Sequence, residues 1–199
     1  MDLCFRRLPV GRILNLGAGS TSVAADRRVV VNVDHVEPTE RLPGIFVVAD
    51  ASALPFRADS FKGALAKDVL EHVQEPVSVL EEIHRAVGRD GVLLLTVPRA
   101  IARAVWDDPT HIRGFTRNAL RTALRLSGWA SDPPIQRIGS IPGAGRLRLT
   151  SHLVTVLQLP GLGHWFGTNW IVFTTRVPEA NEVQPPKSLV TQVTMLRGE

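Results

Sequence analysis

The sequence has a single cysteine, Cys4, and no tyrosine among its 199 residues. One cysteine cannot form an internal disulfide or a multi-cysteine zinc site, which excludes a disulfide-stapled secreted domain. The longest apolar run, residues 92–97, is far shorter than the roughly 20 residues of a membrane-spanning helix. The N-terminal segment reaches Pro9 and Gly11 without the apolar core of a secretory signal. We therefore expect a cytoplasmic protein without a membrane span.

The positive charge is spread along the chain. The formal net charge is +4, from 23 basic residues against 19 acidic ones, and nearly all of the basic residues are arginine. A domain that binds nucleic acid gathers its basic residues on one face, and no such cluster is evident. We therefore expect no nucleic-acid partner.

Segments typical of buried strands alternate with segments typical of helices. One helix is expected over residues 76–87, where proline opens the first turn and apolar residues recur on one face. Gly88 is expected to end this helix, and Asp90 and Gly91 to form the turn into the next strand. A second is expected from Thr116, a good N-cap, to Gly128. The alternation predicts an α/β fold with a mostly parallel sheet covered by helices on both faces. The expected strands are residues 12–16, 29–33, 44–49, 61–66, 92–97 and 170–176.

Two strand ends carry residues suited to a nucleoside ligand. Residues 13–21, Ile-Leu-Asn-Leu-Gly-Ala-Gly-Ser-Thr, form a strand that runs into a glycine-rich turn, where the backbone can approach a ligand closely. Asp34 closes the next apolar strand, where a carboxylate would accept hydrogen bonds from ribose hydroxyls.

Two further strand ends add to this pattern. Asp50 ends the third strand and is followed by Ala51, so its carboxylate can bond the exocyclic amine of an adenine and leave room for the ring. The fourth strand runs into residues 67–73, Lys-Asp-Val-Leu-Glu-His-Val. All four segments stand at the carboxyl ends of successive strands, where open α/β sheets bind their ligands.

Together these segments resemble the class I S-adenosylmethionine-dependent methyltransferase superfamily, in the type 11 branch that carries Leu-Pro-Phe and Val-Leu-Glu-His-Val segments. The resemblance covers roughly residues 12–130. It implies a Rossmann-like, mostly parallel seven-stranded sheet and S-adenosylmethionine as cofactor. We expect one domain over residues 1–177, with a cofactor half at 12–98 and a substrate-side half at 99–177. Residues 178–199 are expected to be a flexible tail.

The resemblance also assigns the cofactor residues. The glycine turn would hold the methionine end, and the acids at the ends of the second and third strands would hold the ribose and the adenine. Lys67 and Asp68 would lie beside the sulfonium. The chain departs from the family pattern at Asn15, which replaces an acid, at Thr21, which replaces a glycine, and at Lys62. Asn15 brings no charge to the cofactor's amino group. The expected cofactor-binding set is Asn15, Gly17, Ala18, Gly19, Asp34, His35, Asp50, Ala51 and Lys67.

Residues 107–116, Asp-Asp-Pro-Thr-His-Ile-Arg-Gly-Phe-Thr, resemble methyltransferases encoded among sugar and polysaccharide enzymes. Methyl transfer to an unactivated alcohol requires a base or a metal to remove its proton. His111 is the first candidate for the base, and a histidine that only caps the following helix is the alternative. Asp108 is a candidate to orient the imidazole or bind a hydroxyl, and a turn acid before Pro109 is the alternative.

Asp68, Glu71 and His72 stand at positions i, i+3 and i+4, which a helix would place on one face, a spacing compatible with one cation. They resemble the magnesium-binding cluster of ubiquinone-pathway O-methyltransferases, with Asp68 replacing a glutamate. The alternative is that Glu71 and His72 shape the pocket, where His72 is also a candidate catalytic residue.

The sequence therefore predicts an S-adenosylmethionine-dependent O-methyltransferase that acts on a hydroxyl of a sugar, an oligosaccharide or another small metabolite. A lipid or quinone acceptor is an alternative, suggested by the apolar residues 147–162. A catalytically inactive pseudo-methyltransferase that only binds a ligand is another, suggested by Asn15, Thr21 and Lys62. The expected partner is a small-molecule or glycan acceptor, and residues 147–167 leave a homodimer open.

Overall fold

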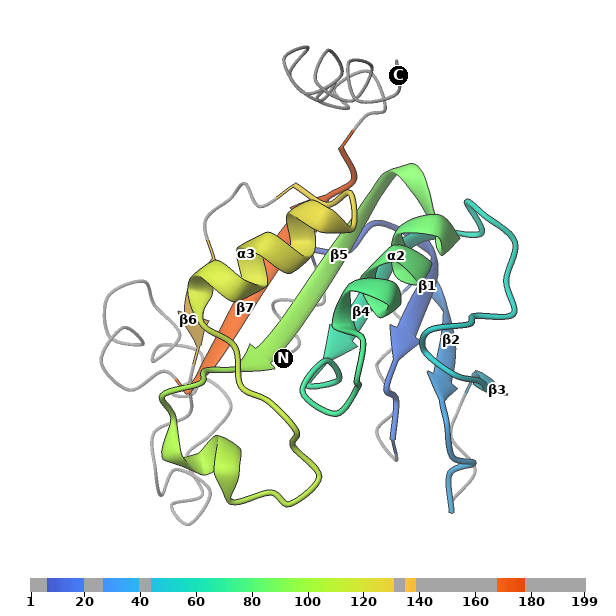
Figure 1. The fold of residues 1–199 in the computed structure, drawn as a ribbon. Helices are drawn as coiled ribbons and strands as arrows, with labels where there is room; N and C mark the ends of the chain where they lie inside the picture. Colours follow the sequence, from blue (N-terminus) through green and yellow to red (C-terminus); the bar gives the residue numbers. More distant parts are fainter. Residues whose placement is uncertain (1–6, 20–26, 40–43, 131–134, 139–167, 178–199) are drawn as a thin grey trace, which may run out of the picture.

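The computed structural model describes residues 7–19, 27–39, 44–130, 135–138 and 168–177. They form a seven-stranded sheet with the strand order β3-β2-β1-β4-β5-β7-β6 (Figure 1). The strands are β1 Gly11–Leu16, β2 Arg28–Asp34, β3 Ile45–Val48, β4 Phe61–Lys67, β5 Val87–Pro98, β6 Gln136–Ile138 and β7 Asn169–Thr175. The helices are α2 Pro76–Ala86, the 3-10 helix η1 Arg103–Trp106 and α3 Arg117–Leu126.

Strands β1 to β5 pair with their neighbours in parallel, and β7 runs antiparallel to both β5 and β6. The predicted mostly parallel, seven-stranded α/β sheet is therefore confirmed. The largest boundary difference lies where a helix stop and a turn were expected at residues 88–91. Val87 already has extended backbone, and the pairing of β5 with β4 shifts register between Phe61 and Gly63. The expected turn is therefore an irregularity within β5.

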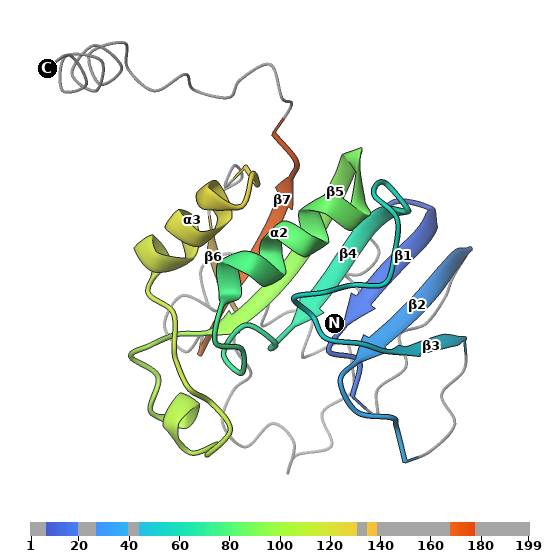
Figure 2. The same ribbon diagram turned by 45° about the vertical axis from the view of Figure 1, so that its right-hand side comes forward.

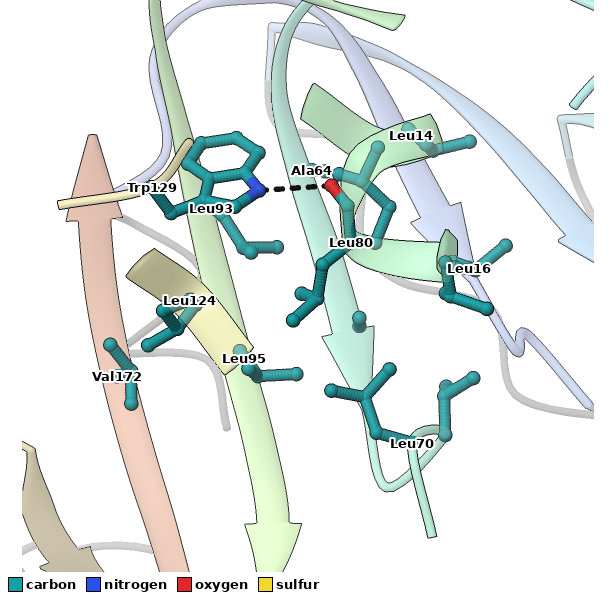
Figure 3. Packing of buried hydrophobic residues seen from close by; sticks show 14 of the residues in the cluster. Leu14, Leu16, Ala64, Leu70, Leu80, Leu93, Leu95, Leu124, Trp129 and Val172 are labelled. Atoms are coloured by element: carbon teal, nitrogen blue, oxygen red, sulfur yellow. Dashed lines mark hydrogen bonds between the residues drawn. The ribbon is translucent and has the colours of Figure 1, made fainter. Parts of the chain in front are cut away.

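Helices α2 and α3 pack on one face of the sheet (Figure 2). Leu80 of α2 and Leu124 of α3 are fully buried against alternate side chains of the strands, among them Leu14 and Leu95 (Figure 3). Trp129, which follows α3, donates from its indole Nε1 to the carbonyl of Leu80 at 3.0 Å. This bond joins the two helices within the main core.

The opposite face of the sheet carries a smaller apolar cluster of Leu8, Ile13, Val30, Leu65 and Leu94. In the described ranges, α2 and α3 both lie on the first face. Helices were also expected on the second face, but no described residue forms an α-helix there. None of the helices in the described part of the chain is long and apolar enough to cross a membrane. The apolar residues 147–167 and the expected tail at 178–199 lie outside the described residues.

Because β1 to β5 are parallel, their carboxyl ends meet at one edge of the sheet. The loop over residues 99–116, which contains η1, lies at this same edge (Figure 2). The backbone N–H of Ile112 donates to the carbonyl of Glu71 at 2.9 Å, and Arg113 donates to the carbonyl of Gln74. These bonds tie the loop to the segment that follows β4.

Candidate active site

A cavity of about 670 Å³ opens at the carboxyl edge of the sheet. We call it the larger cavity, because a smaller one adjoins it. It is lined by residues at the ends of four neighbouring strands and by one residue of the loop after β5. Its volume lies within the range of about 300 to 1,000 Å³ that is usual for small-molecule sites. It is lined by Leu16, Gly17, Asp34, His35, Ala49, Asp50, Ala51, Asp68, Val69, His72, Val73 and Thr110.

The turn after β1 requires glycine at position 17. Gly17 has φ +65°, and a Cβ there would lie 2.4 Å from Cγ2 of Val69, so a side chain would meet both backbone strain and a clash. Gly19 has φ +52° but open space around it, and its N–H donates to Asp34 Oδ2 at 2.8 Å. The turn therefore holds the β2 carboxylate in place.

The carboxylates at the ends of β2 and β3 lie on the same wall of the larger cavity. The N–H of Ala49 donates to the carbonyl of Asp34 at 2.9 Å, which holds the two strand ends together. Asp50 Oδ1 accepts hydrogen bonds from Ser52 N and Ser52 Oγ, and these bonds lower the pKa of Asp50. Asp34 Oδ1 lies 2.9 Å from Nδ1 of the exposed His35. Both carboxylates are therefore held in fixed orientations.

A smaller cavity of about 190 Å³ adjoins the first through Asp68, which lines both. Asp68 Oδ1 accepts from Thr96 Oγ1 and from Asn169 Nδ2, each at 2.9 Å. These bonds link the end of β4 to β5 and to the start of β7. The smaller cavity is lined by Asp68, Glu71, Pro98, Ala102, Val105, His111, Thr168 and Asn169.

Glu71 is the most unusual residue of the smaller cavity because it is fully buried. Neither of its carboxyl oxygens has a hydrogen-bond partner within the described ranges. Burial raises the pKa of Glu71 to about 8, and the negative charges of Asp68 and Asp108 add to this effect. Glu71 is therefore mostly protonated and uncharged near pH 7.

His111 lies beside this carboxyl group. Its Nδ1 is 2.7 Å from the carbonyl oxygen of Val105, and since a carbonyl only accepts, this contact places the proton on Nδ1. The other nitrogen, Nε2, keeps its lone pair and lies 4.0 Å from Glu71 Oε1 and 3.8 Å from Asp108 Oδ2. His111 is thus arranged to accept a proton at Nε2.

His72 forms the other side of this cluster. Its ring lies edge-on to that of His111 with the centroids 4.7 Å apart. Its Nδ1 is 3.2 Å from the carbonyl oxygen and 3.1 Å from the hydroxyl oxygen of Thr110, and that hydroxyl donates to Asp108 Oδ1. Those bonds from Thr110 hold the pKa of Asp108 below its usual value. One ligand atom each of Glu71, His72 and His111 lies within 4.8 Å of the others.

Comparison with known proteins supports the fold. Residues 13–95 match the family model described as a methyltransferase domain. A solved structure described as a S-adenosylmethionine-dependent methyltransferase from Methanosarcina mazei aligns with a TM-score of 0.63 and 16% identity, over 90% of this chain and 99% of that one. The chain has the class I methyltransferase fold.

Two other similarities show how far the likeness extends. An uncharacterized protein of Methanocaldococcus jannaschii is 28% identical over 96 residues, which are 46% of this chain. The match spans about half of that relative, 47% of its length. The structure of a protein described as the [4+2]-cyclase SpnF aligns with a TM-score of 0.60 and 19% identity, over 88% of this chain and 79% of that one. The methyltransferase fold thus also occurs in a protein named for a different reaction.

Within this methyltransferase fold, the structure brings together most of the residues that the sequence assigned to the cofactor. Gly17, Asp34, His35, Asp50 and Ala51 line the larger cavity. Gly19 does not line this cavity, but its N–H donates a hydrogen bond to Asp34, which does.

Three expected cofactor residues, Asn15, Ala18 and Lys67, are not among those that line the larger cavity. Asn15 points to the other face of β1 from Leu16 because side chains alternate along a strand. It is buried there and donates to Asn32 Oδ1 at 2.8 Å instead of to the glycine turn. Ala18 is buried, and the half-exposed Lys67 has its Nζ 4.0 Å from Asp68 Oδ2.

The expected cation ligands Asp68, Glu71 and His72 are arranged differently from the prediction. Residues 68–72 form a turn and not a helix, because Asp68 has φ +53°, which a helix does not accommodate. Asp68 is held by β5 and β7, and His111 takes its place beside Glu71 and His72. The magnesium expectation therefore lacks its predicted geometry.

Sequence reasoning missed Thr110 and Asn169. Thr110 had a local signal, since a threonine two residues after an aspartate often bonds that carboxylate in a turn. Asn169 is 101 residues from Asp68 in the sequence and had no local signal.

Proposed function

We propose that this protein is an S-adenosylmethionine-dependent O-methyltransferase whose acceptor is a hydroxyl group of a sugar or another small metabolite. One observation carries the proposal: the wall of strand-end acids in the larger cavity meets a pair of histidines at its junction with the smaller cavity. Methyl transfer to a hydroxyl requires a cofactor site beside a group that accepts the hydroxyl proton. The strand-end acids would supply the first and the histidines the second.

The residues of the larger cavity fit S-adenosylmethionine. Asp34 would accept from the ribose hydroxyls, and the Asp50 oxygen that does not bond Ser52 would accept from the adenine amine. Gly17 would let the backbone approach the methionine end. When bound, the cofactor supplies a methyl group on a positively charged sulfur, which leaves as a neutral thioether.

The chain's own residues would handle the acceptor proton. His111 Nε2 carries the lone pair that takes the hydroxyl proton, and Val105 holds the ring in that tautomer. Asp108 Oδ2, at 3.8 Å from His111 Nε2, would stabilise the resulting imidazolium. Glu71 is uncharged near pH 7, so it places no negative charge beside His111.

A binding module without turnover is the second candidate. The pairing of Asn15 with Asn32 leaves the glycine turn without a charge that would attract the cofactor's amino group. The same fold in a protein named as a cyclase is a reminder that fold alone does not fix the reaction. A lipid or quinone acceptor depends on residues 147–162, which lie outside the described residues.

The test is calorimetric titration of the full chain with S-adenosylmethionine and S-adenosylhomocysteine, followed by methyl transfer from labelled cofactor to panels of soluble glycosides, lipids and quinones. Binding of both compounds and label on a glycoside oxygen would support the proposal. Binding without label on any glycoside, lipid or quinone favours the binding module. No binding of either compound contradicts the proposed methyltransferase and favours a module that binds a different ligand.

A further inference from the structure

We propose that Glu71, His72 and His111 form a binding site for a divalent transition-metal ion, of the class that includes Zn²⁺ and Fe²⁺. The three side chains come from two segments, the turn after β4 and the loop after β5, and their ligand atoms lie within 4.8 Å of one another. The site is defined by these side chains alone and does not depend on methyl transfer. With an ion bound, His111 Nε2 is a ligand, so the proton-acceptor role proposed above applies to the metal-free protein.

The buried carboxyl group of Glu71 points to a ligand. A carboxyl group taken out of water without a hydrogen-bond partner costs free energy, and such groups in proteins are normally paired or coordinate a metal. Glu71 is fully buried, and both of its oxygens lack a partner within the described ranges. Glu71 lines the smaller cavity, which His111 also lines. A bound cation would supply the missing partner.

The two imidazoles are oriented as metal ligands are. Metal-binding histidines donate from one ring nitrogen to a carbonyl or carboxylate, which fixes the tautomer and leaves the other nitrogen for the ion. His111 Nδ1 contacts the Val105 carbonyl. His72 Nδ1 contacts two acceptors of Thr110, because the Thr110 hydroxyl already donates to Asp108. Both rings therefore keep the lone pair on Nε2.

The type of donor selects the class of ion. Two imidazoles and one carboxylate suit Zn²⁺ and Fe²⁺, whereas Mg²⁺ and Ca²⁺ prefer sets made of oxygen ligands. Three protein ligands also leave a coordination position for water or a substrate oxygen. His72 lines the larger cavity and the other two line the smaller one, so this position would stand where the two cavities meet.

Closing the site around an ion requires only small movements. Metal–nitrogen distances of 2.0–2.1 Å in a tetrahedral site place ligand atoms about 3.4 Å apart. His111 Nε2 and Glu71 Oε1 are 4.0 Å apart and no pair of the three ligand atoms is more than 4.8 Å apart, so side-chain rotations that move the atoms together by up to about 1.4 Å bring them into range. The bond from Ile112 N to the Glu71 carbonyl already fixes the two backbone segments together.

The test is calorimetric titration of the EDTA-treated full chain with Zn²⁺, in the presence of excess Mg²⁺ and without cofactor. We expect one ion per chain and an affinity that falls at least about 100-fold in both Glu71→Gln and His111→Ala, because each removes a ligand. Glutamine has the shape of the neutral carboxyl group, so Glu71→Gln should fold. This variant therefore still tests the site if His111→Ala does not fold.

His35→Ala is the matched control, because it removes a different histidine that also lies beside a carboxylate. Its Zn²⁺ affinity should equal that of the unchanged protein. Titration with Co²⁺ adds a second measurement, since the intense visible absorption of a four- or five-coordinate Co²⁺ ion should appear and be lost in Glu71→Gln. Zn²⁺ binding that is absent, or equal in Glu71→Gln and the unchanged protein, or lost only in His35→Ala, would overturn the proposal. A failed cofactor titration would leave this result unaffected.

Discussion

Asp50 and Glu71 are carboxyl groups at the same edge of the sheet, and their surroundings move their pKa values in opposite directions. Asp50 is exposed and accepts two hydrogen bonds from Ser52, which lower its pKa. Glu71 is buried without such bonds, and burial raises its pKa to about 8. The larger cavity therefore offers fixed negative charge to hydrogen-bond donors, whereas the smaller cavity holds a neutral acid beside a proton acceptor.

Replacement of His111 by alanine tests the smaller cavity most strongly. We expect methyl transfer to fall by about 100- to 10,000-fold, the usual contribution of a general base. The measurement is turnover of labelled S-adenosylmethionine with an accepted glycoside, and added imidazole should restore part of the rate. Near-normal turnover would show that proton removal does not need this ring.

Replacement of Gly17 by alanine tests the wall of the larger cavity. A positive φ and a Cβ 2.4 Å from Val69 Cγ2 should together cost roughly 2 to 5 kcal/mol in the free energy of unfolding. Gly19→Ala is the control, because it has positive φ but open space, and should cost only about 1 to 2 kcal/mol. Equal losses in urea unfolding would mean that the contact with Val69 is unimportant.

Replacement of Glu71 by glutamine tests the raised pKa. In metal-free protein the folded state keeps its proton up to about pH 8, whereas the unfolded chain releases it near the ordinary value of 4.5. The unfolded state therefore binds fewer protons between these values, and the free energy of unfolding falls as pH rises, by roughly 1.4 kcal/mol per pH unit from this group. Below the ordinary value the contribution is constant.

Urea unfolding at about pH 5 and about pH 7.5 measures this dependence, for which we expect a loss of roughly 3 kcal/mol from Glu71. Glu71→Gln should remove that part of the loss, since glutamine does not ionise. Parallel pH profiles for the two proteins would show that the buried carboxyl group titrates normally.

Replacement of Asp50 by asparagine should have the smallest effect. The side chain keeps its shape but loses its charge, and a hydrogen bond to a charged group is worth about 1 kcal/mol more than a neutral one, so cofactor affinity should fall about 5- to 10-fold. Asp90→Asn is the control, because Asp90 lies in the first part of β5, far from the carboxyl edge. An unchanged affinity in Asp50→Asn would remove this acid from the proposed adenine contacts.

The sequence predicted the fold and the acids of the larger cavity because both depend on local patterns. Buried parallel strands appear as short apolar runs, and a residue that directly follows such a run lies at the carboxyl edge. The same reasoning placed Gly17, Asp34 and Asp50 correctly at one edge. It misplaced Asn15, because the glycine turn follows the strand, whereas the pleat points Asn15 to the opposite face.

The cluster of the smaller cavity could not be predicted in the same way. The spacing of Asp68, Glu71 and His72 suggested a helix, but the positive φ of Asp68 makes a turn. His111 meets Glu71 only because Ile112 bonds the Glu71 backbone across the gap between two loops. Such contacts depend on how the loops pack, which local periodicity does not describe.

The bond from Asn169 to Asp68 has a consequence for synthesis of the protein on the ribosome. Strands β1 to β5 leave the ribosome before β7, and until β7 pairs, one side of β5 is an open strand edge. Asp68, which both cavities share, accepts the hydrogen bond from Thr96 but not yet the one from Asn169 at that stage. The nascent chain would therefore form the wall of strand-end acids first and complete the junction of the two cavities only when β7 emerges.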